Sequence, residues 1–207
     1  MTLLKPDKGH LLVAKPSIIG DVSFNRSVIL LTEYNTENGS VGFILNKPLE
    51  YTLKDFIPEI NSNLPVYNGG PVEQDNLYFI HKIPELIPGS VEISQGIFWG
   101  GDFKAISKLL IQDKLTQSQI RFFLGYSGWS KQQLDQELEL NSWVVAPNDY
   151  KNNIIGNNNN NLWKEKMLEL GGNYMLWSNA PKTLLTIKYL VYVTRLSESG
   201  FCIKLAQ

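Results

Sequence analysis

Residues 27–46 have the sequence SVILLTEYNTENGSVGFILN, in which two apolar runs are separated by a turn. The first run, residues 27–32, is rich in β-branched and apolar residues, which favours a strand. Asn38 and Gly39 both tolerate positive φ and mark the turn, after which residues 41–46 resume the apolar pattern. The stretch therefore predicts an antiparallel hairpin with a loop longer than the tightest kind.

Elsewhere along the chain, short apolar runs and helix-capping residues mark further elements. Apolar runs bounded by turn residues predict strands at residues 11–14, 77–81 and 142–146. Capping patterns predict helices that begin at Thr52 and Asp102. Because strands come first and helices gather later, without strand–helix–strand alternation, the order predicts an α+β fold.

A segment rich in glycine and aromatic residues precedes the clearest capping pattern. The apolar run at residues 119–126 has no decisive period, so a strand and a short helix both remain open there. We interpret the following residues as a tight turn that enters a helix capped by Ser130 and Gln133. The residues of this structural motif are Gly125, Tyr126, Gly128, Trp129, Ser130, Gln133 and Leu134.

Ser127 lies in a Gly-Tyr-Ser-Gly-Trp sequence that is superficially similar to the nucleophile elbow of hydrolases. That motif needs a glycine where Trp129 stands. A serine nucleophile also needs a base, and His10 and His81 are the only histidines in the sequence. We therefore favour a structural role for Ser127 and assign no catalytic residue.

The composition excludes several kinds of site. The chain has 207 residues, of which 43% are hydrophobic and 19% charged, with a formal net charge of −1. The single cysteine, Cys202, excludes an internal disulfide, and two histidines are too few for a convincing zinc or iron centre. We expect no metal and no cofactor, and the near-neutral charge argues against direct DNA binding.

The sequence shows no targeting signal or membrane span. Residues 11–14 are too few for the apolar core of a signal peptide. The longest apolar run, residues 184–193, is interrupted by Lys188 and is far shorter than the ~20 residues of a membrane-spanning helix. These features, with the single cysteine, predict a cytoplasmic protein. The asparagine-rich residues 151–161 predict a mobile surface loop.

Three short segments form a candidate ligand or partner surface: Asn46 with Lys47, Gly69 with Gly70, and His81. Each adjoins a strand-like run, and strand ends can converge at one rim of a closed sheet. Glycines there would expose backbone N–H groups, which together with Lys47 could receive an anionic or carbonyl group. In the competing interpretation these segments are tight corners of a small barrel, and His81 is a hydrogen-bonded structural residue.

An ordered set of short motifs resembles the YqgE/AlgH family. The set consists of GHLLVA (9–14), SVILL (27–31), GFILNKP (42–48), GGPV (69–72) and GYSGW (125–129), together with His81, Gln133, Leu134, Glu137 and Trp143. The resemblance covers roughly residues 9–180 and is specific, because several multi-residue motifs recur in the right order.

The resemblance implies an α+β fold in which a bifurcated, mostly antiparallel β-sheet forms a pseudo-barrel with flanking helices. It also implies a bacterial, cytoplasmic protein of a family usually described as transcriptional regulators, whose biochemical activity is not established. Family chains usually end soon after the segment matching residues 177–181. This predicts a single domain over residues 1–181 and a peripheral C-terminal extension over residues 182–207.

Three classes of function remain open. We rank first a non-enzymatic regulatory or binding protein that acts on an unknown protein partner or small ligand. A small-ligand sensor or an uncharacterised enzyme using Gly69, Gly70, Pro71 and His81 comes second, because the chain lacks nucleophile, metal and phosphate motifs. Direct DNA binding comes last, because the net charge is −1 and no helix-turn-helix pattern is evident.

The charge balance yields a first testable prediction. We expect the purified protein to bind random-sequence duplex DNA weakly or not at all at physiological salt, because a near-neutral chain releases few counterions from DNA. A titration followed by fluorescence anisotropy at several salt concentrations measures this. Sub-micromolar binding with a steep salt dependence would contradict the expectation.

Overall fold

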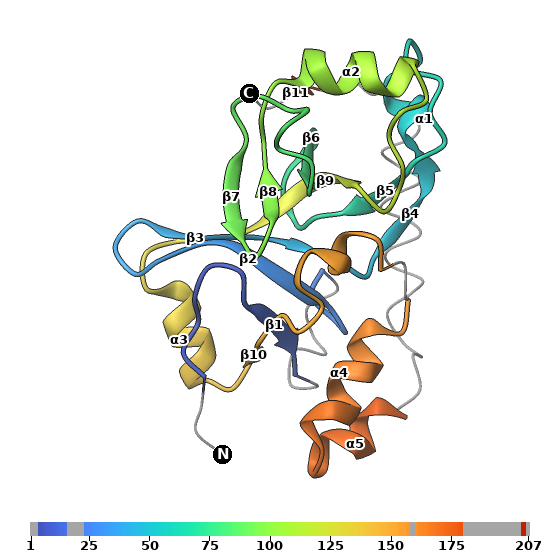
Figure 1. Ribbon diagram of the computed structural model, residues 1–207. Helices are drawn as coiled ribbons and strands as arrows, with labels where there is room; N and C mark the ends of the chain where they lie inside the picture. The colour runs from blue at the N-terminus through green and yellow to red at the C-terminus, as the bar shows by residue number, and fades with distance from the viewer. Residues whose placement is uncertain (1–3, 16–22, 158–159, 180–203, 206–207) are drawn as a thin grey trace.

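The chain folds into one branched β-sheet with helices around its outer sides (Figure 1). The computed structural model describes residues 4–15, 23–157, 160–179 and 204–205. The strands are β1 (Leu11–Ala14), β2 (Val28–Asn35), β3 (Gly39–Ile44), β4 (Pro48–Thr52), β5 (Pro65–Asn68), β6 (Val72–His81), β7 (Val91–Ser94), β8 (Ile97–Trp99), β9 (Ile120–Trp129), β10 (Trp143–Ala146) and β11 (Lys204–Leu205). The helices are α1 (Leu53–Phe56), α2 (Phe103–Ile111), α3 (Gln133–Glu139), α4 (Leu162–Leu170) and α5 (Asn173–Ser178), with a 3₁₀ turn, η2 (Lys151–Ile155).

The sheet is mostly antiparallel, and its main path runs β10-β1-β2-β3-β9-β6-β8-β7. The hairpin predicted from residues 27–46 is confirmed as β2 and β3, with Ile29 opposite Ile44. The α+β class and the bifurcated sheet are confirmed as well. The described strands do not close into a barrel, because β10 and β7 stand at the two ends of this path and do not pair with each other.

Strand β9 is the point at which the sheet branches. One edge of β9 pairs with β6 along most of its length. The other edge is shared: the first half of β9 pairs with β5 in parallel, and the second half pairs with β3 in antiparallel. The run that had no decisive period is therefore a strand, and it continues to Trp129 without the tight turn that we predicted after it.

Gly69 joins the three strands at the branch. Its N–H donates to the Leu124 carbonyl at 2.8 Å, while its own carbonyl accepts from the Ile44 N–H at 3.0 Å. The Ser127 hydroxyl donates to the same carbonyl at 2.9 Å. A Cβ atom at Gly69 would lie only 2.1 Å from the Gly125 carbonyl oxygen, so the backbones approach more closely here than any side chain allows.

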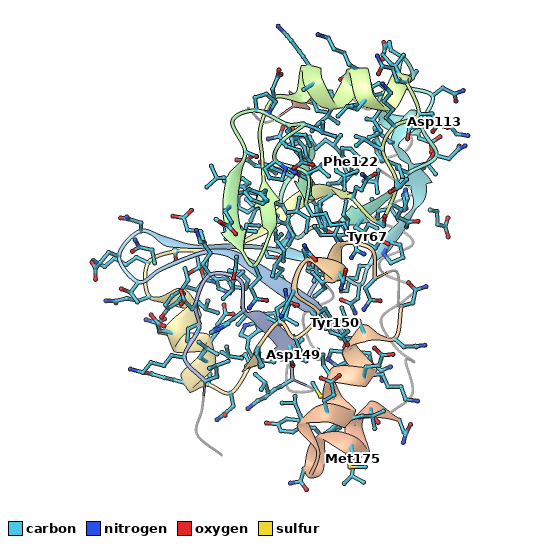
Figure 2. The ribbon with its side chains drawn as sticks, in the orientation of Figure 1. Tyr67, Asp113, Phe122, Asp149, Tyr150 and Met175 are labelled. Carbon is cyan, nitrogen blue, oxygen red and sulfur yellow. The ribbon has the colours of Figure 1, made fainter. Side chains whose placement is uncertain are left out.

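Apolar side chains cover both faces of the central strands (Figure 2). On β9, Phe123 belongs to a cluster that α4 covers, whereas Phe122 points to the opposite face, into a cluster that α1 and α2 cover. A third cluster gathers under α3 and contains Trp129 and Trp143. This alternation follows from the two-residue period of a strand, and burial of both faces explains why β1 and the first four residues of β2 are all apolar.

Two of the predicted helix starts are confirmed. The Asp102 carboxylate accepts from the Lys104 N–H at 2.8 Å and caps α2. The Thr52 N–H donates to the Asp55 carboxylate at 2.7 Å at the start of the short helix α1. Acidic side chains near the unpaired N–H groups of the first turn therefore predicted the starts of both helices correctly.

The predicted capping box of Ser130 and Gln133 is only half present: the Gln133 side-chain oxygen accepts from the Ser130 N–H at 2.9 Å, but Ser130 is not the N-cap of the helix. Helix α3 begins at Gln133, after Gln132 in a left-handed conformation with φ of 60°. The Ser130 hydroxyl donates to the Gln133 side-chain oxygen and does not cap a backbone N–H. Because β9 continues to Trp129, residues 130–132 are used to turn the chain before the helix can start.

The first part of the asparagine-rich stretch, residues 151–157, is anchored and is not simply a surface loop, whereas residues 158–159 lie outside the described residues. Within η2, Ile154 and Ile155 are fully buried in the same cluster as Phe123. The Arg121 guanidinium donates to the Asn157 carbonyl at 2.7 Å, which ties the following residues to β9. The prediction from composition was wrong because the segment also contains two isoleucines. Their buried apolar area stabilises an ordered conformation in spite of the asparagines around them.

Most of the predicted C-terminal extension, residues 182–207, lies outside the described residues, and so does Cys202. The exception is β11, whose Lys204 and Leu205 pair in parallel with Asn76 and Leu77 of β6. No helix among the described residues is long and apolar enough to cross a membrane.

The branch predicts that two glycines of the same region respond differently to alanine. We expect Gly69→Ala to lower the free energy of unfolding by about 3 kcal/mol or more, because its Cβ would meet fixed backbone. Gly128→Ala is the control: its Cβ would meet only side-chain atoms, the Tyr126 ring at 3.0 Å and a Val72 methyl group at 3.5 Å, and the ring can move aside. Urea denaturation of both variants measures the difference, and equal losses would contradict this account of the branch.

Candidate functional site

Asn46, two residues after the end of β3, has a structural role. Its side-chain oxygen accepts from the Val28 N–H at 2.8 Å, and its amide donates to the Arg26 carbonyl at 2.8 Å. These two side-chain hydrogen bonds take the place of backbone hydrogen bonds at the point where β3 and β2 separate. Both ends of the amide are used in this way, which is typical of a structural asparagine.

Lys47, Gly69 and Gly70 lie close to Asn46, as predicted, and they are also bonded within the chain. The Lys47 ammonium donates to the Ser23 carbonyl at 2.6 Å. The Lys47 carbonyl accepts from the Asn68 N–H at 2.9 Å, and the Asn68 side chain accepts from the Gly70 N–H at 3.0 Å. The glycine N–H groups that we expected to face a ligand therefore have partners in the protein.

His81 does not join these residues, so the predicted convergence at a single rim is wrong. His81 pairs with Ile120 at the start of β9, whereas Gly70 packs against Tyr126 near its end. Because a strand rises about 3.4 Å per residue, the two places lie roughly 20 Å apart along β9. The convergence failed because β6 runs the length of β9 and carries His81 to the far end.

The His81 side chain is fully buried and hydrogen-bonded. Its Nδ1 accepts from the Ile83 N–H at 3.3 Å, which leaves the Nε2 proton to be donated to the Gly100 carbonyl at 3.3 Å. The ring stacks on Phe98 with centroids 5.9 Å apart. Burial lowers the pKa of His81 and is opposed by the Gly100 hydrogen bond, so the neutral ring is favoured in the folded protein.

Ser127 is fully buried, and its hydroxyl is bonded to the Gly69 carbonyl. It therefore does not present a nucleophile to solvent, in agreement with its predicted structural role. Within the part of the chain that the structure describes, no three His, Cys, Asp or Glu side chains form a group that could hold a metal ion.

Sequence reasoning missed the central role of Glu137. One of its carboxylate oxygens accepts from the indole N–H of Trp129 at 2.9 Å and from that of Trp143 at 2.7 Å. The other oxygen accepts from the Gln133 amide at 3.0 Å. These bonds attach α3 to β9 and β10. The available signal was the presence of a tryptophan on each side of a helix that carries three acidic residues, but the sequence did not show which of the three would bond to them.

A hollow of about 340 Å³, here called the motif groove, opens where the 125–130 segment reaches the surface. Cross-strand pairing places Glu33, Val41 and Gly128 in one row over β2, β3 and β9. Since Gly128 has no side chain, the row has a notch beside Tyr126, which is on the same face of β9, and Ser130, which follows the strand. A Cβ atom at Gly128 would point at the Tyr126 ring and at Val72, which also line the groove.

The groove combines apolar walls with polar groups. Val41 and Val72 form the apolar part, and Glu33 and Asn38 are exposed at its rim. Burial and the nearby Glu73 charge raise the pKa of Tyr126, so its hydroxyl stays protonated and can donate. Glu33 forms no ion pair with any residue that the structure describes. This arrangement can hold an apolar group and pair a donor or cation with the carboxylate.

Comparison with known proteins identifies the group to which the chain is related. The family model described as AlgH-like matches residues 11–175. A UPF0301 protein of Bacteroides fragilis is 40% identical over 179 residues, which is 86% of this chain and 89% of that protein. A UPF0301 protein of Chlorobium phaeobacteroides is 38% identical over 86% of this chain and 94% of its own length.

Two solved structures share the fold. The crystal structure of protein DIP2367 from Corynebacterium diphtheriae has a TM-score of 0.68 at 24% identity, over 87% of this chain and 95% of that chain. The solution structure of the AlgH protein from Pseudomonas aeruginosa has a TM-score of 0.63 at 24% identity, over 89% of this chain and 100% of that one.

The buried histidine predicts a specific pH dependence of stability. With a folded-state pKa below the unfolded value of about 6.5, His81 contributes stability above that pH and loses it as the pH falls through 6.5. We expect the difference in unfolding free energy between the wild type and His81→Gln to shrink between about pH 7.5 and 5.5. Denaturation at each pH measures it, and subtracting the variant cancels the titration of the carboxylates. A difference that does not change with pH would contradict the assignment.

Proposed function

The chain belongs to the AlgH-like family, and we propose that it is a non-enzymatic regulatory or binding protein of the bacterial cytoplasm. In this proposal the motif groove holds the partner. The observation that carries the proposal is the notch at Gly128. A side chain at this position would not clash with the backbone of the branch, but it would fill part of the groove.

The two glycine positions of the Gly-Tyr-Ser-Gly-Trp segment support this distinction. Gly125 has a positive φ of 66° and a Cβ there would lie 2.6 Å from the Val72 carbonyl, so the backbone itself requires it. Gly128 has neither constraint. A glycine within a strand that is not required by its backbone is typical of a place where another group approaches closely.

A non-enzymatic role is supported by the use of the polar residues. Ser127 and His81, which the sequence analysis considered for nucleophilic or acid–base chemistry, are buried and bonded to backbone groups. The alternative, a ligand sensor or enzyme built on Gly69, Gly70, Pro71 and His81, has less support because these residues lie at opposite ends of β9.

Affinity capture with quantitative mass spectrometry tests the proposal. We expect a partner recovered from a bacterial lysate by the wild type to be lost by Gly128→Ala, which fills the notch, while the fold is retained. Gly156→Ala is the control away from the groove: its Cβ would lie 3.1 Å from the Ser118 Cα, about as close as the 3.0 Å contact at Gly128. Every captured protein being retained by Gly128→Ala would contradict a role for the groove.

A further inference from the structure

The last three residues of β9 are paired on one edge only. On the side of β3, the ladder continues to Trp129. On the other side, β6 begins at Val72, opposite Tyr126, and no strand among the described residues pairs with β9 beyond that point. Residues 127–129 therefore form a short open edge of the sheet, at the end of the Gly-Tyr-Ser-Gly-Trp segment.

The backbone N–H and C=O groups of Gly128 face this open edge. Opposite residues in an antiparallel pair either exchange both hydrogen bonds or exchange none. The Val41 carbonyl accepts from the Thr32 hydroxyl of β2 at 3.2 Å, so it points away from β9. Val41 and Gly128 are therefore a pair without mutual hydrogen bonds, and Gly128 directs its N–H and C=O to the side where β6 has ended.

The motif groove gives access to this edge. Val72, Tyr126, Gly128 and Ser130 all line the groove, and Gly128 is half-buried. Neither backbone group of Gly128 is bonded to another described residue. The groove therefore contains an unpaired backbone donor and acceptor at the position where the strand has no side chain to cover them.

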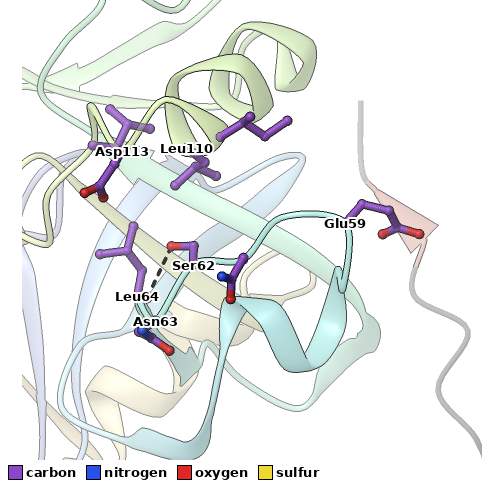
Figure 3. A pocket seen from close by; sticks show the side chains of 9 residues that line it. Glu59, Ser62, Asn63, Leu64, Leu110 and Asp113 are labelled. Atoms are coloured by element: carbon purple, nitrogen blue, oxygen red, sulfur yellow. Dashed lines mark hydrogen bonds between the residues drawn. The ribbon is translucent and has the colours of Figure 1, made fainter.

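A larger hollow, of about 540 Å³, lies between the segment after α1 and the end of α2, but its backbone is already bonded (Figure 3). The Leu64 N–H donates to the Ser62 hydroxyl at 3.4 Å, and the Leu64 carbonyl accepts from the Leu53 N–H at 2.9 Å. The Ser62 carbonyl accepts from the Lys54 N–H at 3.0 Å. At these residues the larger hollow has no open edge like the one at Gly128.

We propose that the occupant of the motif groove is an extended polypeptide segment that adds a strand to β9 at Gly128, antiparallel to β9 and in line with β6. This inference rests on the proposed function and adds the kind of partner. A helix bonds its own backbone groups internally, so it leaves the Gly128 N–H and C=O unpaired. An extended segment supplies both a carbonyl and an N–H to them.

The groove also indicates the side chains of the segment. Residues opposite each other on neighbouring strands share a face, so the segment residue opposite Gly128 turns its side chain towards the notch. An aromatic side chain there covers the glycine backbone and contacts Val41 and Tyr126 at the sides of the notch. Glu33, which forms no ion pair with the described residues, favours a basic residue elsewhere in the segment.

Amide hydrogen exchange of the full chain, followed residue by residue by NMR, tests the open edge. By the alternation of the ladder, Trp129 exchanges both hydrogen bonds with Ser40, whereas the Gly128 N–H has no partner. We expect the Gly128 amide to exchange at least about tenfold faster than the Trp129 amide. Equal protection of the two amides would overturn the proposal.

Random linear peptides displayed on phage supply the probe for the segment. The wild-type chain is the bait, and Gly128→Ala, which fills the notch, is used for counter-selection. We expect enriched peptides to share an aromatic and a basic residue. A synthetic copy should bind Gly128→Ala about tenfold more weakly than the wild type, and bind Gly156→Ala as the wild type. Glu33→Gln should also weaken binding, whereas Glu139→Gln, at an exposed position of α3, should not.

Backbone N-methylation of the same peptide tests strand addition itself. Methylation of the aromatic residue removes the N–H that bonds to Gly128 and should abolish binding, whereas methylation of either neighbour, whose N–H points away from β9, should be tolerated. Binding should also slow exchange of the Gly128 amide. Loss of binding at no position, or at all positions alike, would overturn strand addition.

The outcomes separate this inference from the proposed function. A selected peptide that is lost with Gly128→Ala but is insensitive to N-methylation supports the groove as a partner site and overturns strand addition. Failure to enrich any peptide against Gly128→Ala overturns strand addition as well. Retention of every lysate partner by Gly128→Ala would contradict the proposed function itself.

Discussion

The carbonyl oxygen of Gly69 is the point on which the branched sheet depends. It accepts from the Ile44 N–H of β3 and from the Ser127 hydroxyl of β9, while the Gly69 N–H donates to Leu124 of β9. Without this residue, β3 would leave β9 with unpaired backbone groups inside the protein, which costs about 1–3 kcal/mol for each group. The branch also requires backbones to touch, so glycine is the only residue that fits there.

The branch explains the structural roles of several polar residues in or next to the family motifs. Asn46, Asn68 and Ser127 satisfy backbone groups that the diverging strands leave without ladder partners. Glu137 does the same for two buried indole N–H groups. Side chains that could support chemistry therefore have structural roles. In the proposed function, a partner is recognised by the motif groove, where Gly128 contributes no side chain.

Local sequence signals predicted the elements that depend on local interactions. The hairpin of β2 and β3 follows from two apolar runs and an Asn-Gly turn, and the caps of α1 and α2 follow from acidic residues near free N–H groups. The signals failed where a distant contact dominates. Ser130 loses its capping role because β9 extends further than expected, and the asparagine-rich stretch is held by Ile154 and Ile155.

The sequence by itself determined the α+β class, the main strands and the family, because short apolar runs, caps and ordered motifs are properties of neighbouring residues. Only the tertiary structure decided the roles of the glycine-containing and polar corners. Gly69 and Ser127 are 58 residues apart, and their contact, like the separation of His81 from Gly70, depends on how β5, β6 and β9 are aligned. Strand register sets such distances, and it is chosen by the packing of both sheet faces together, which no local pattern encodes.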